Sequence, residues 1–314
     1  MTFSSTHLTA LKDLVVLHFT GADAVTFLQS QLTNAVDQLP PEHAVIAGFC
    51  QAKGRLQASM VVWSDPLDPL ARYALVKQSI ASTLQKRLSL FVLRAKVKIQ
   101  LCAARVYGWE PASGSALTLP IRTLSVQHQD GFSFITAPNS SLSDAPRAWL
   151  IQYDAQAPAL ETQASLSDWQ AKDIYAGLAW IDEHNYEAFL PQDINLDIIG
   201  GVNFKKGCFP GQEVVARLHY RTTARRRAAL GLIHTAPTTQ LNPGQDIFST
   251  ESPERAVGRI INIAYDHNQQ HYALLMEVII EGLAEKELFV VDNTQQQQRI
   301  QHAALPYGWE IAKY

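Results

Sequence analysis

Cysteine is scarce in this sequence: the 314 residues include three, Cys50, Cys102 and Cys208, which lie far apart along the chain. This spacing offers neither the paired cysteines of a disulfide framework nor a CxxC pair for a metal ion. The ten histidines offer no convincing ligand spacing either, because His267 and His271 flank an expected turn. We therefore predict a protein of a reducing compartment with no dedicated metal site.

Long apolar runs are also missing. No run of about 18 apolar residues occurs, so the sequence predicts no membrane span. Residues 1–7 lack the basic and apolar regions of a signal peptide, and they lack the arginines of a transit peptide. We expect a cytoplasmic protein without a membrane partner.

Charge of either sign is modest, since charged residues make up 18% of the chain and the net charge is −3. A balance of this kind excludes a protein that binds polyanions with its whole surface, and any contact with nucleic acid would need a local basic patch. The hydrophobic share of 47% is that of a globular protein. A chain of this length predicts two or three domains.

The N-terminal third predicts an α+β layer. Short runs rich in β-branched residues alternate with two runs of helical periodicity. We expect strands at 14–19, 44–50, 55–63, 72–77 and 97–102, and helices from Asp23 and over 79–90. This order indicates helices over one face of an antiparallel sheet, close to a ferredoxin-like split βαβ fold.

The rest of the chain predicts a second α+β part and an all-β end. Residues 103–160 contain short strands, and Ser167 with Gln170 forms a capping-box pattern that opens a helix to about Gly177. From Ala228 onward, short strands separated by turns predict a small barrel or sandwich. The expected domains are 1–110 (α+β, ferredoxin-like), 111–225 (α+β, ending in the loop described next) and 226–314 (β-barrel).

The most distinctive stretch is Lys206-Gly207-Cys208-Phe209-Pro210-Gly211-Gln212-Glu213. It predicts a tight turn with a thiol just before a helix, where the helix N-terminus and neighbouring lysines lower a cysteine pKa. Cys208 is thus a candidate nucleophile, redox sensor or transient ligand for iron or sulfur. The alternative is a structural cysteine. One thiol cannot hold an iron–sulfur cluster, which needs about four ligands.

Other residues of this stretch have a functional and a structural interpretation. Lys206 pairs with a ligand carboxylate or lowers the thiol pKa, or it is a solvated charge. Gly207 and Gly211 serve backbone geometry, because glycine alone adopts positive φ cheaply. Glu213 and Arg217 form an i,i+4 pair that organises the loop, or they contact a ligand.

This octet, followed by Ala216-Arg217, resembles the signature of the YgfZ family, folate-binding proteins related to the T-protein (aminomethyltransferase) of the glycine cleavage system. Matching residues extend over most of the chain. They are Gly21-Ala22-Asp23, Lys53-Gly54-Arg55, Ala176-Gly177-Leu178, Pro191-Gln192-Asp193-Ile194-Asn195-Leu196 and Leu305-Pro306-Tyr307. The resemblance implies a three-domain cloverleaf around a central channel that binds a tetrahydrofolate.

The same resemblance implies a role in assembly or repair of iron–sulfur enzymes, including one that thiomethylates tRNA. It implies that Cys208 and Lys206 are the reactive residues, in a loop that faces the folate cleft. Folate contacts would fall at Trp169 and at Leu14, where family members often carry tryptophan. Without the resemblance, Trp169 is a core residue of an amphipathic helix.

Two other functions stay open at this stage. One is an active folate-dependent one-carbon transferase or demethylase, although no counterpart of the acid with which T-proteins activate folate can be placed. The other is an RNA-binding accessory module. Its phosphate contacts would come from Arg221, Arg225, Arg226 and Arg227, which otherwise receive a folate tail or an acidic protein, or form a solvated face.

Overall fold

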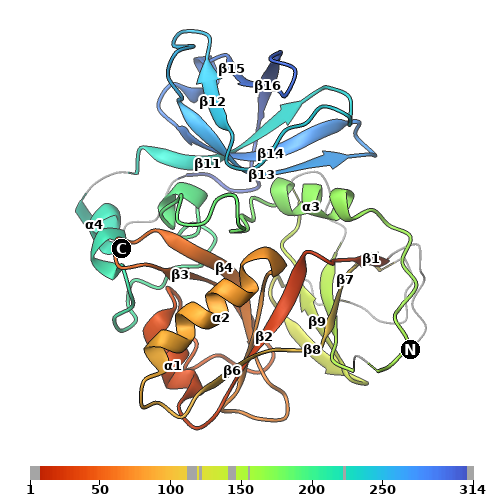
Figure 1. Ribbon diagram of the computed structural model, residues 1–314, viewed down its shortest axis with the longest axis vertical. Coiled ribbons are helices and arrows are strands. Elements are labelled where there is room, and N and C mark those ends of the chain that lie inside the picture. The colour runs from red at the N-terminus through yellow and green to blue at the C-terminus, as the bar shows by residue number, and fades with distance from the viewer. Residues whose placement is uncertain are drawn as a thin grey trace.

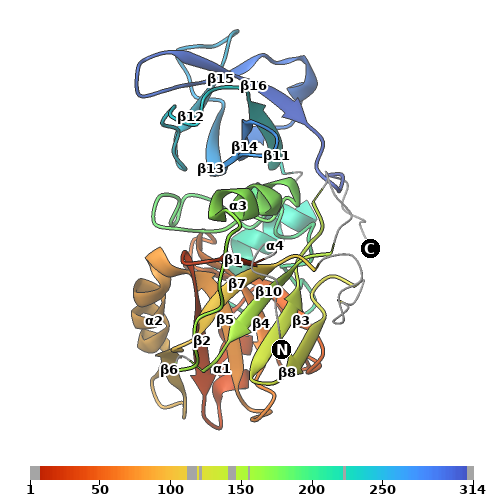
Figure 2. The ribbon, with the colours of Figure 1, turned by 90° about the vertical axis from the view of Figure 1, so that its right-hand side faces the viewer.

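The computed structural model describes residues 8–111, 119, 122–140, 146–154, 156–221 and 224–309. Within them the chain forms three sheets: two open sheets that lie side by side below, and a closed barrel above them (Figures 1 and 2). The α+β class and the C-terminal barrel predicted from the sequence are both confirmed.

The first sheet is antiparallel, with the strand order β3-β4-β5-β2-β6. Each of the nine residues of β4 is buried, because the sheet is covered on both faces at that strand. Helix α2 turns the buried side chains of Ile80, Ala81, Leu84 and Leu88 inward, at the spacing of one helical stripe. The elements are β2 (Leu14–Thr20), α1 (Ala24–Gln31), β3 (Ala44–Cys50), β4 (Leu56–Ser64), β5 (Arg72–Lys77), α2 (Gln78–Val92) and β6 (Lys98–Leu101).

The second sheet has the order β1-β7-β10-β9-β8 and takes two strands from the first 110 residues. It shares one hydrophobic core with the first sheet, in which Trp63 and Trp149 are fully buried. The elements are β1 (Leu8–Ala10), β7 (Arg105–Trp109), β8 (Val126–Gln129), β9 (Phe132–Thr136), β10 (Ala148–Gln152) and α3 (Leu166–Tyr175).

The barrel closes in the order β11-β14-β13-β12-β15-β16 and has a core of its own. A register shift in β13 between Ile260 and Asn262 marks a bulge, and bulges re-aim the side chains that follow them. The elements are β11 (Arg226–Ile233), β12 (Asp246–Ser249), β13 (Gly258–Asp266), β14 (His271–Ile279), the 3₁₀ turn η3 (Leu283–Glu285), β15 (Leu288–Val291) and β16 (Gln297–Ala303).

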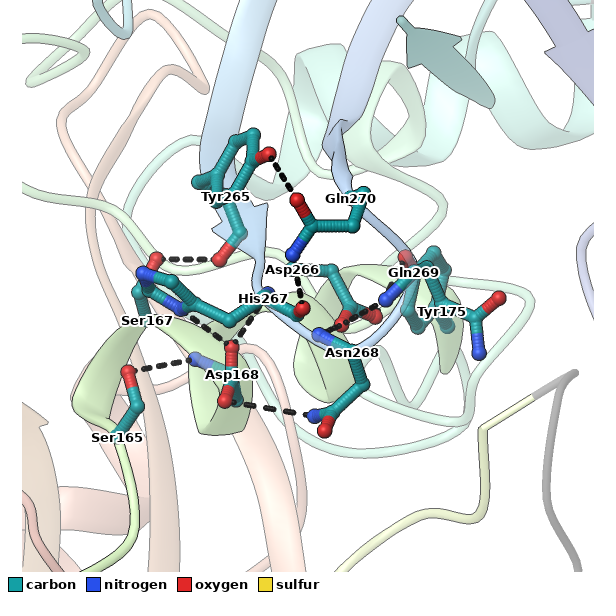
Figure 3. A network of polar contacts seen from close by, with 10 residues as sticks. All are labelled: Ser165, Ser167, Asp168, Tyr175, Tyr265, Asp266, His267, Asn268, Gln269 and Gln270. Carbon is teal, nitrogen blue, oxygen red and sulfur yellow. Dashed lines mark hydrogen bonds and ion pairs between the residues drawn. The ribbon is translucent and has the colours of Figure 1, made fainter. Parts of the chain in front are cut away.

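The barrel rests on α3 through the turn between β13 and β14 (Figure 3). The Ser167 hydroxyl donates to the carbonyl oxygen of Tyr265 at 2.7 Å, and Asp168 accepts from the backbone and ring of His267 at 2.8 Å each. The capping prediction was wrong by two residues: the extended Ser165 is the N-cap, and its hydroxyl accepts from the Asp168 N–H.

Tyr307, beyond the last barrel strand, returns to the two-sheet body. Its hydroxyl donates to the carbonyl oxygen of Gly177 at 2.9 Å and lies 3.5 Å from the side-chain amide of Asn195. Gly177 has φ +68°, and an added Cβ would lie 2.2 Å from the tyrosine oxygen. Only glycine therefore fits beneath this ring.

Candidate functional site

The loop before α4 (Gln212–Arg221) is anchored to the end of helix α1 by Lys206. The Lys206 ammonium donates to the carbonyl oxygens of Gln29 and Leu32, the latter at 2.8 Å, at the C-terminal end of α1. It also lies 5.2 Å from the ring centre of Phe209, which is buried. Burial lowers the Lys206 pKa to about 8, and nearby Asp37 and Cys208 oppose that shift. The ammonium thus caps a helix, a role that neither sequence interpretation included.

Gly211 brings the β3–β4 turn against the start of α4. At its φ of +80°, an added Cβ would lie 2.6 Å from both the carbonyl oxygen of Gln51 and the Cα of Gly54. Gly54, also at positive φ, in turn touches Val214. The prediction for Gly207 was wrong: its φ is not positive, and an added Cβ would meet open space.

Cys208 is exposed on this anchored loop, with the buried Phe209 as its neighbour. The turn therefore points the thiol outward while the next side chain fills the core. Cys50 is buried, and burial raises the pKa of its thiol well above the ordinary range. Of the two, Cys208 is the thiol that a solvent-borne partner can reach.

The arginine cluster divides into two groups. Arg226 pairs with Glu277 at 2.8 Å, and the buried Arg227 pairs with Asp197 at 2.6 Å. The first pair links two barrel strands, β11 and β14, whereas the second joins the barrel to the body and leaves the Arg227 guanidinium no surface for RNA. Arg221 and Arg225, in contrast, are exposed and form no ion pair with a described residue.

The i,i+4 pair between Glu213 and Arg217 does not form, although both side chains are exposed on α4. Among the residues that the structure describes, neither has an ion-pair partner. Arg217 is consequently available for contacts outside the chain. Gln212, half-buried, starts the helix with its N–H on the carbonyl oxygen of Phe209.

A pocket of about 220 Å³ lies where the first sheet, α3 and the barrel meet, and we call it the central pocket. Its walls come from the end of β5, one face of α3, the segment after α3, strand β13 and the loop that precedes β12. The lining residues are Lys77, Gln170, Asp173, Ile174, Leu178, Trp180, Asp182, His184, Pro243, Asn262 and Ile263.

Trp180 is the aromatic side chain of this pocket, and contacts with three residues hold it. Its indole N–H donates to Asp173 at 2.9 Å, and the Lys77 ammonium lies 5.8 Å from its ring centre. Its backbone N–H donates to Asn262 Oδ1, and its carbonyl oxygen accepts from Asn262 Nδ2, each at 2.8 Å. The bulge in β13 thus supplies the residue that holds the Trp180 backbone.

Two carboxyl groups lie in or next to the central pocket: Asp182 lines it, and Asp13 contacts its lining residues Lys77 and Gln170. Asp13 pairs with Lys77 and accepts from Gln170 at 2.8 Å, but its buried Oδ1 has no hydrogen-bond partner among the described residues. Asp182 accepts from the His184 N–H at 2.9 Å, and burial raises the pKa of its carboxyl. The pocket therefore offers oxygens that can accept hydrogen bonds from a bound molecule.

Trp169 and Leu14, the folate positions expected from the sequence, do not line the central pocket. Trp169 is buried under Gly108, with the Arg147 guanidinium 4.9 Å from its ring centre. It borders a separate pocket of about 450 Å³ beside Asp168, and its buried Nε1 has no partner among the described residues. Leu14 is buried in β2, paired with Lys77 of β5. Cys208 does not line the central pocket either.

The sequence analysis missed Trp180, Asp182 and Gln170. The signal was the run Trp180-Ile181-Asp182-Glu183-His184, which joins an aromatic ring to two acids and a histidine directly after a glycine turn. No three His, Cys, Asp or Glu side chains gather closely enough to hold a metal ion in the described ranges. Within the same ranges, no helix has the length and apolar character needed to cross a bilayer.

Comparison with known proteins gives a consistent result. The tRNA-modifying protein YgfZ of Edwardsiella ictaluri is 32% identical over 234 residues, which cover 69% of this chain and 68% of that protein. YgfZ of Sodalis glossinidius is 31% identical over 240 residues, with coverages of 70% and 69%. No protein-family model matches the chain.

A solved structure shares the fold. The glycine cleavage system aminomethyltransferase T from Bartonella henselae superposes with a TM-score of 0.71 at 12% identity, covering 96% of this chain and 86% of that one. The T-protein-like arrangement predicted from the sequence is thereby confirmed.

Proposed function

The chain belongs to the YgfZ family, and on that premise we propose that it is a folate-binding protein that supports tRNA modification. The relatives are named for tRNA modification, and the fold is that of an aminomethyltransferase. The observation that carries the folate proposal is the central pocket at the meeting point of three structural units.

The residues of the central pocket fit the fused ring of a reduced folate. Its volume of about 220 Å³ is below the roughly 300–1,000 Å³ of drug-sized sites, so it suits the ring and leaves the tail outside. Trp180 offers an aromatic face, and Asp182 offers carboxyl oxygens for the N–H groups of a pterin. Lys77 and His184 would meet the carboxylates of the tail. A bound tetrahydrofolate would supply a one-carbon carrier.

We propose that Cys208 acts at the protein surface, apart from this pocket. Lys206 and Gly211 anchor the loop from both sides, and the thiol between them is exposed. A fixed, accessible thiol suits contact with another protein better than reaction with a small molecule in a closed cleft. In this proposal the chain supports assembly or repair of iron–sulfur enzymes, among them the enzyme that thiomethylates tRNA.

One observation favours a second candidate function, a folate-dependent one-carbon transferase. Asp182 is a carboxyl group in the pocket whose pKa is raised by burial, and such groups serve as general acids or bases. The sequence alone did not identify an acid that activates folate, and Asp182 is a candidate for that role. Turnover of a methylated or aminomethylated donor with folate, lost in Asp182→Asn, would establish this function in place of the accessory role.

Calorimetric titration with reduced folates tests the proposal. Trp180→Phe should weaken binding, because it removes the indole N–H that holds the ring against Asp173. Asp182→Asn should weaken binding, because it removes a carboxylate acceptor from the pocket. Trp169→Phe is the matched control: the same chemical change removes an Nε1 that has no partner. If only Trp169→Phe weakens binding, the site is the neighbouring pocket. If no folate binds at millimolar concentration, the folate proposal fails.

A further inference from the structure

Five basic side chains gather on α4 and on the two loops packed against it, and we call them the basic face. They are Lys53, Arg55, Lys205, Arg217 and Arg221, and all five are exposed. Glu213 is the single acid in the three segments 51–55, 203–211 and 212–221. The basic face is thus strongly positive on a chain whose net charge is −3.

Packing makes these segments one surface. The Gly54 and Gly211 backbones touch, which places the β3–β4 turn with Lys53 and Arg55 against the start of α4 (Figure 1). On the other side, Phe204 stacks on His219 of α4 with ring centres 3.7 Å apart, which ties the loop of Lys205 to the same helix. Arg217 and Arg221 are one helical turn apart, so they project from one side of α4.

The charged groups of the basic face are not paired with an opposite charge in the described part of the chain. Arg55 donates to the carbonyl oxygen of Ala188, and none of the five forms an ion pair with a described residue. Arg226 and Arg227, a few residues further on, form ion pairs with Glu277 and Asp197, respectively. A solvated helix surface normally mixes both signs of charge, whereas this one holds five cations that form no ion pair with a described residue.

We propose that the basic face docks RNA. Guanidinium and ammonium groups at this density neutralise phosphates, and the release of counterions drives binding. Tyr220 projects beside them with 63% of its surface exposed, and unstacked bases of RNA stack on such rings. An acidic protein partner would also need an apolar centre, and the exposed aliphatic side chain on the described part of α4 is Val214, at 38%. The choice of tRNA as the RNA to test rests on the proposed function.

The test measures binding of unfractionated tRNA to the full chain over a series of salt concentrations. We expect Arg217→Glu/Arg221→Glu to weaken binding by at least about tenfold and to reduce the slope of log K against log salt by about 1.5, the loss for two phosphate contacts. The matched control is Lys86→Glu/Arg87→Glu on α2, which makes the same charge change at two exposed residues of another element. The control should bind tRNA nearly as the wild type does.

Each other outcome overturns the inference. Equal losses in both double variants would mean a response to net charge alone. Polyglutamate that competes as well as tRNA would indicate an acidic protein partner. Absence of tRNA binding at low salt would refute the proposal that the basic face docks RNA. Folate titration of the same variants separates the two proposals, because the basic face lies outside the central pocket. Intact folate binding with no tRNA binding refutes only the docking face, and the reverse result refutes only the folate site.

Discussion

Asn262 holds the backbone of Trp180 from both sides: its Oδ1 accepts from the Trp180 N–H, and its Nδ2 donates to the Trp180 carbonyl oxygen, each at 2.8 Å. A barrel side chain therefore fixes the aromatic residue of a pocket whose other walls belong to the body. The central pocket depends on how the barrel is docked.

Changing Asn262 should loosen the pocket in two steps. Asn262→Asp keeps the acceptor for the Trp180 N–H and loses the donor, while Asn262→Leu loses both. We expect folate affinity to fall by about tenfold for Leu, the equivalent of one hydrogen bond, and by less for Asp. Calorimetry measures the affinities, and circular dichroism checks the fold. Equal folate affinities in the wild type and both variants would show that Asn262 does not support the folate site.

Asp182→Asn should raise stability and lower folate affinity together. Because burial raises the Asp182 pKa, the folded state binds its proton more tightly than the unfolded state does. The carboxyl therefore costs stability above its folded pKa, and that cost disappears as the pH falls through this value. Denaturant titration should give the variant a higher free energy of unfolding than the wild type at neutral pH, but not at acidic pH. A variant that is less stable at neutral pH contradicts this account.

Lys206→Met tests the lysine cap at the end of α1. Removing the donors to Gln29 and Leu32 leaves two carbonyl oxygens unpaired, which should cost about 1–3 kcal/mol of unfolding free energy. Because the folded pKa is lowered from 10.5 to about 8, the unfolded state binds more protons between these values. Wild-type stability should therefore rise with pH in that window relative to the variant. A constant difference between pH 7 and 10 would show that Lys206 is not desolvated.

Two glycines of the signature loop should respond differently to alanine. An added Cβ at Gly211 meets backbone atoms at 2.6 Å and positive φ, whereas one at Gly207 meets open space. We expect Gly211→Ala to lower the free energy of unfolding by more than about 1 kcal/mol. Gly207→Ala should leave the free energy of unfolding near that of the wild type. Chemical denaturation measures both, and equal stabilities would contradict the tight packing of the β3–β4 turn on α4.

Cys208→Ala should keep the fold and folate binding while losing function in cells. The side chain is exposed, so its removal leaves no cavity. In the native wild type, Cys208 should react with a disulfide reagent first and Cys50 only on unfolding. Complementation of a deletion strain measures function, and full activity of the variant would exclude a role for this thiol.

The fold was largely predictable, because the β-branched runs and the glycine turns that determine it are local signals. The strands of the first sheet lie within a few residues of their predicted positions, and the short strands expected from Ala228 onward form the barrel. The capping of α3 was placed two residues late because Ser165 and Ser167 are both good caps, and only the contact of Ser167 with Tyr265 distinguishes them.

The pocket was less predictable, for a physical reason. Trp180 lies in a segment without regular structure, and its position depends on Asn262, 82 residues later, through the docking of the barrel. The separate roles of Arg226 and Arg221 likewise depend on where Glu277 lies in the folded chain. No local periodicity carries that information.

The return of Tyr307 to Gly177 has a consequence for biosynthesis. Its hydroxyl reaches a carbonyl of the body from a point 130 residues later in the chain, beyond all six barrel strands. During vectorial synthesis the two sheets and most of the barrel leave the ribosome before this latch can close. A nascent chain stalled before Tyr307 would therefore expose the Gly177 backbone, and proteolysis of such chains at that turn would show that Tyr307 protects it.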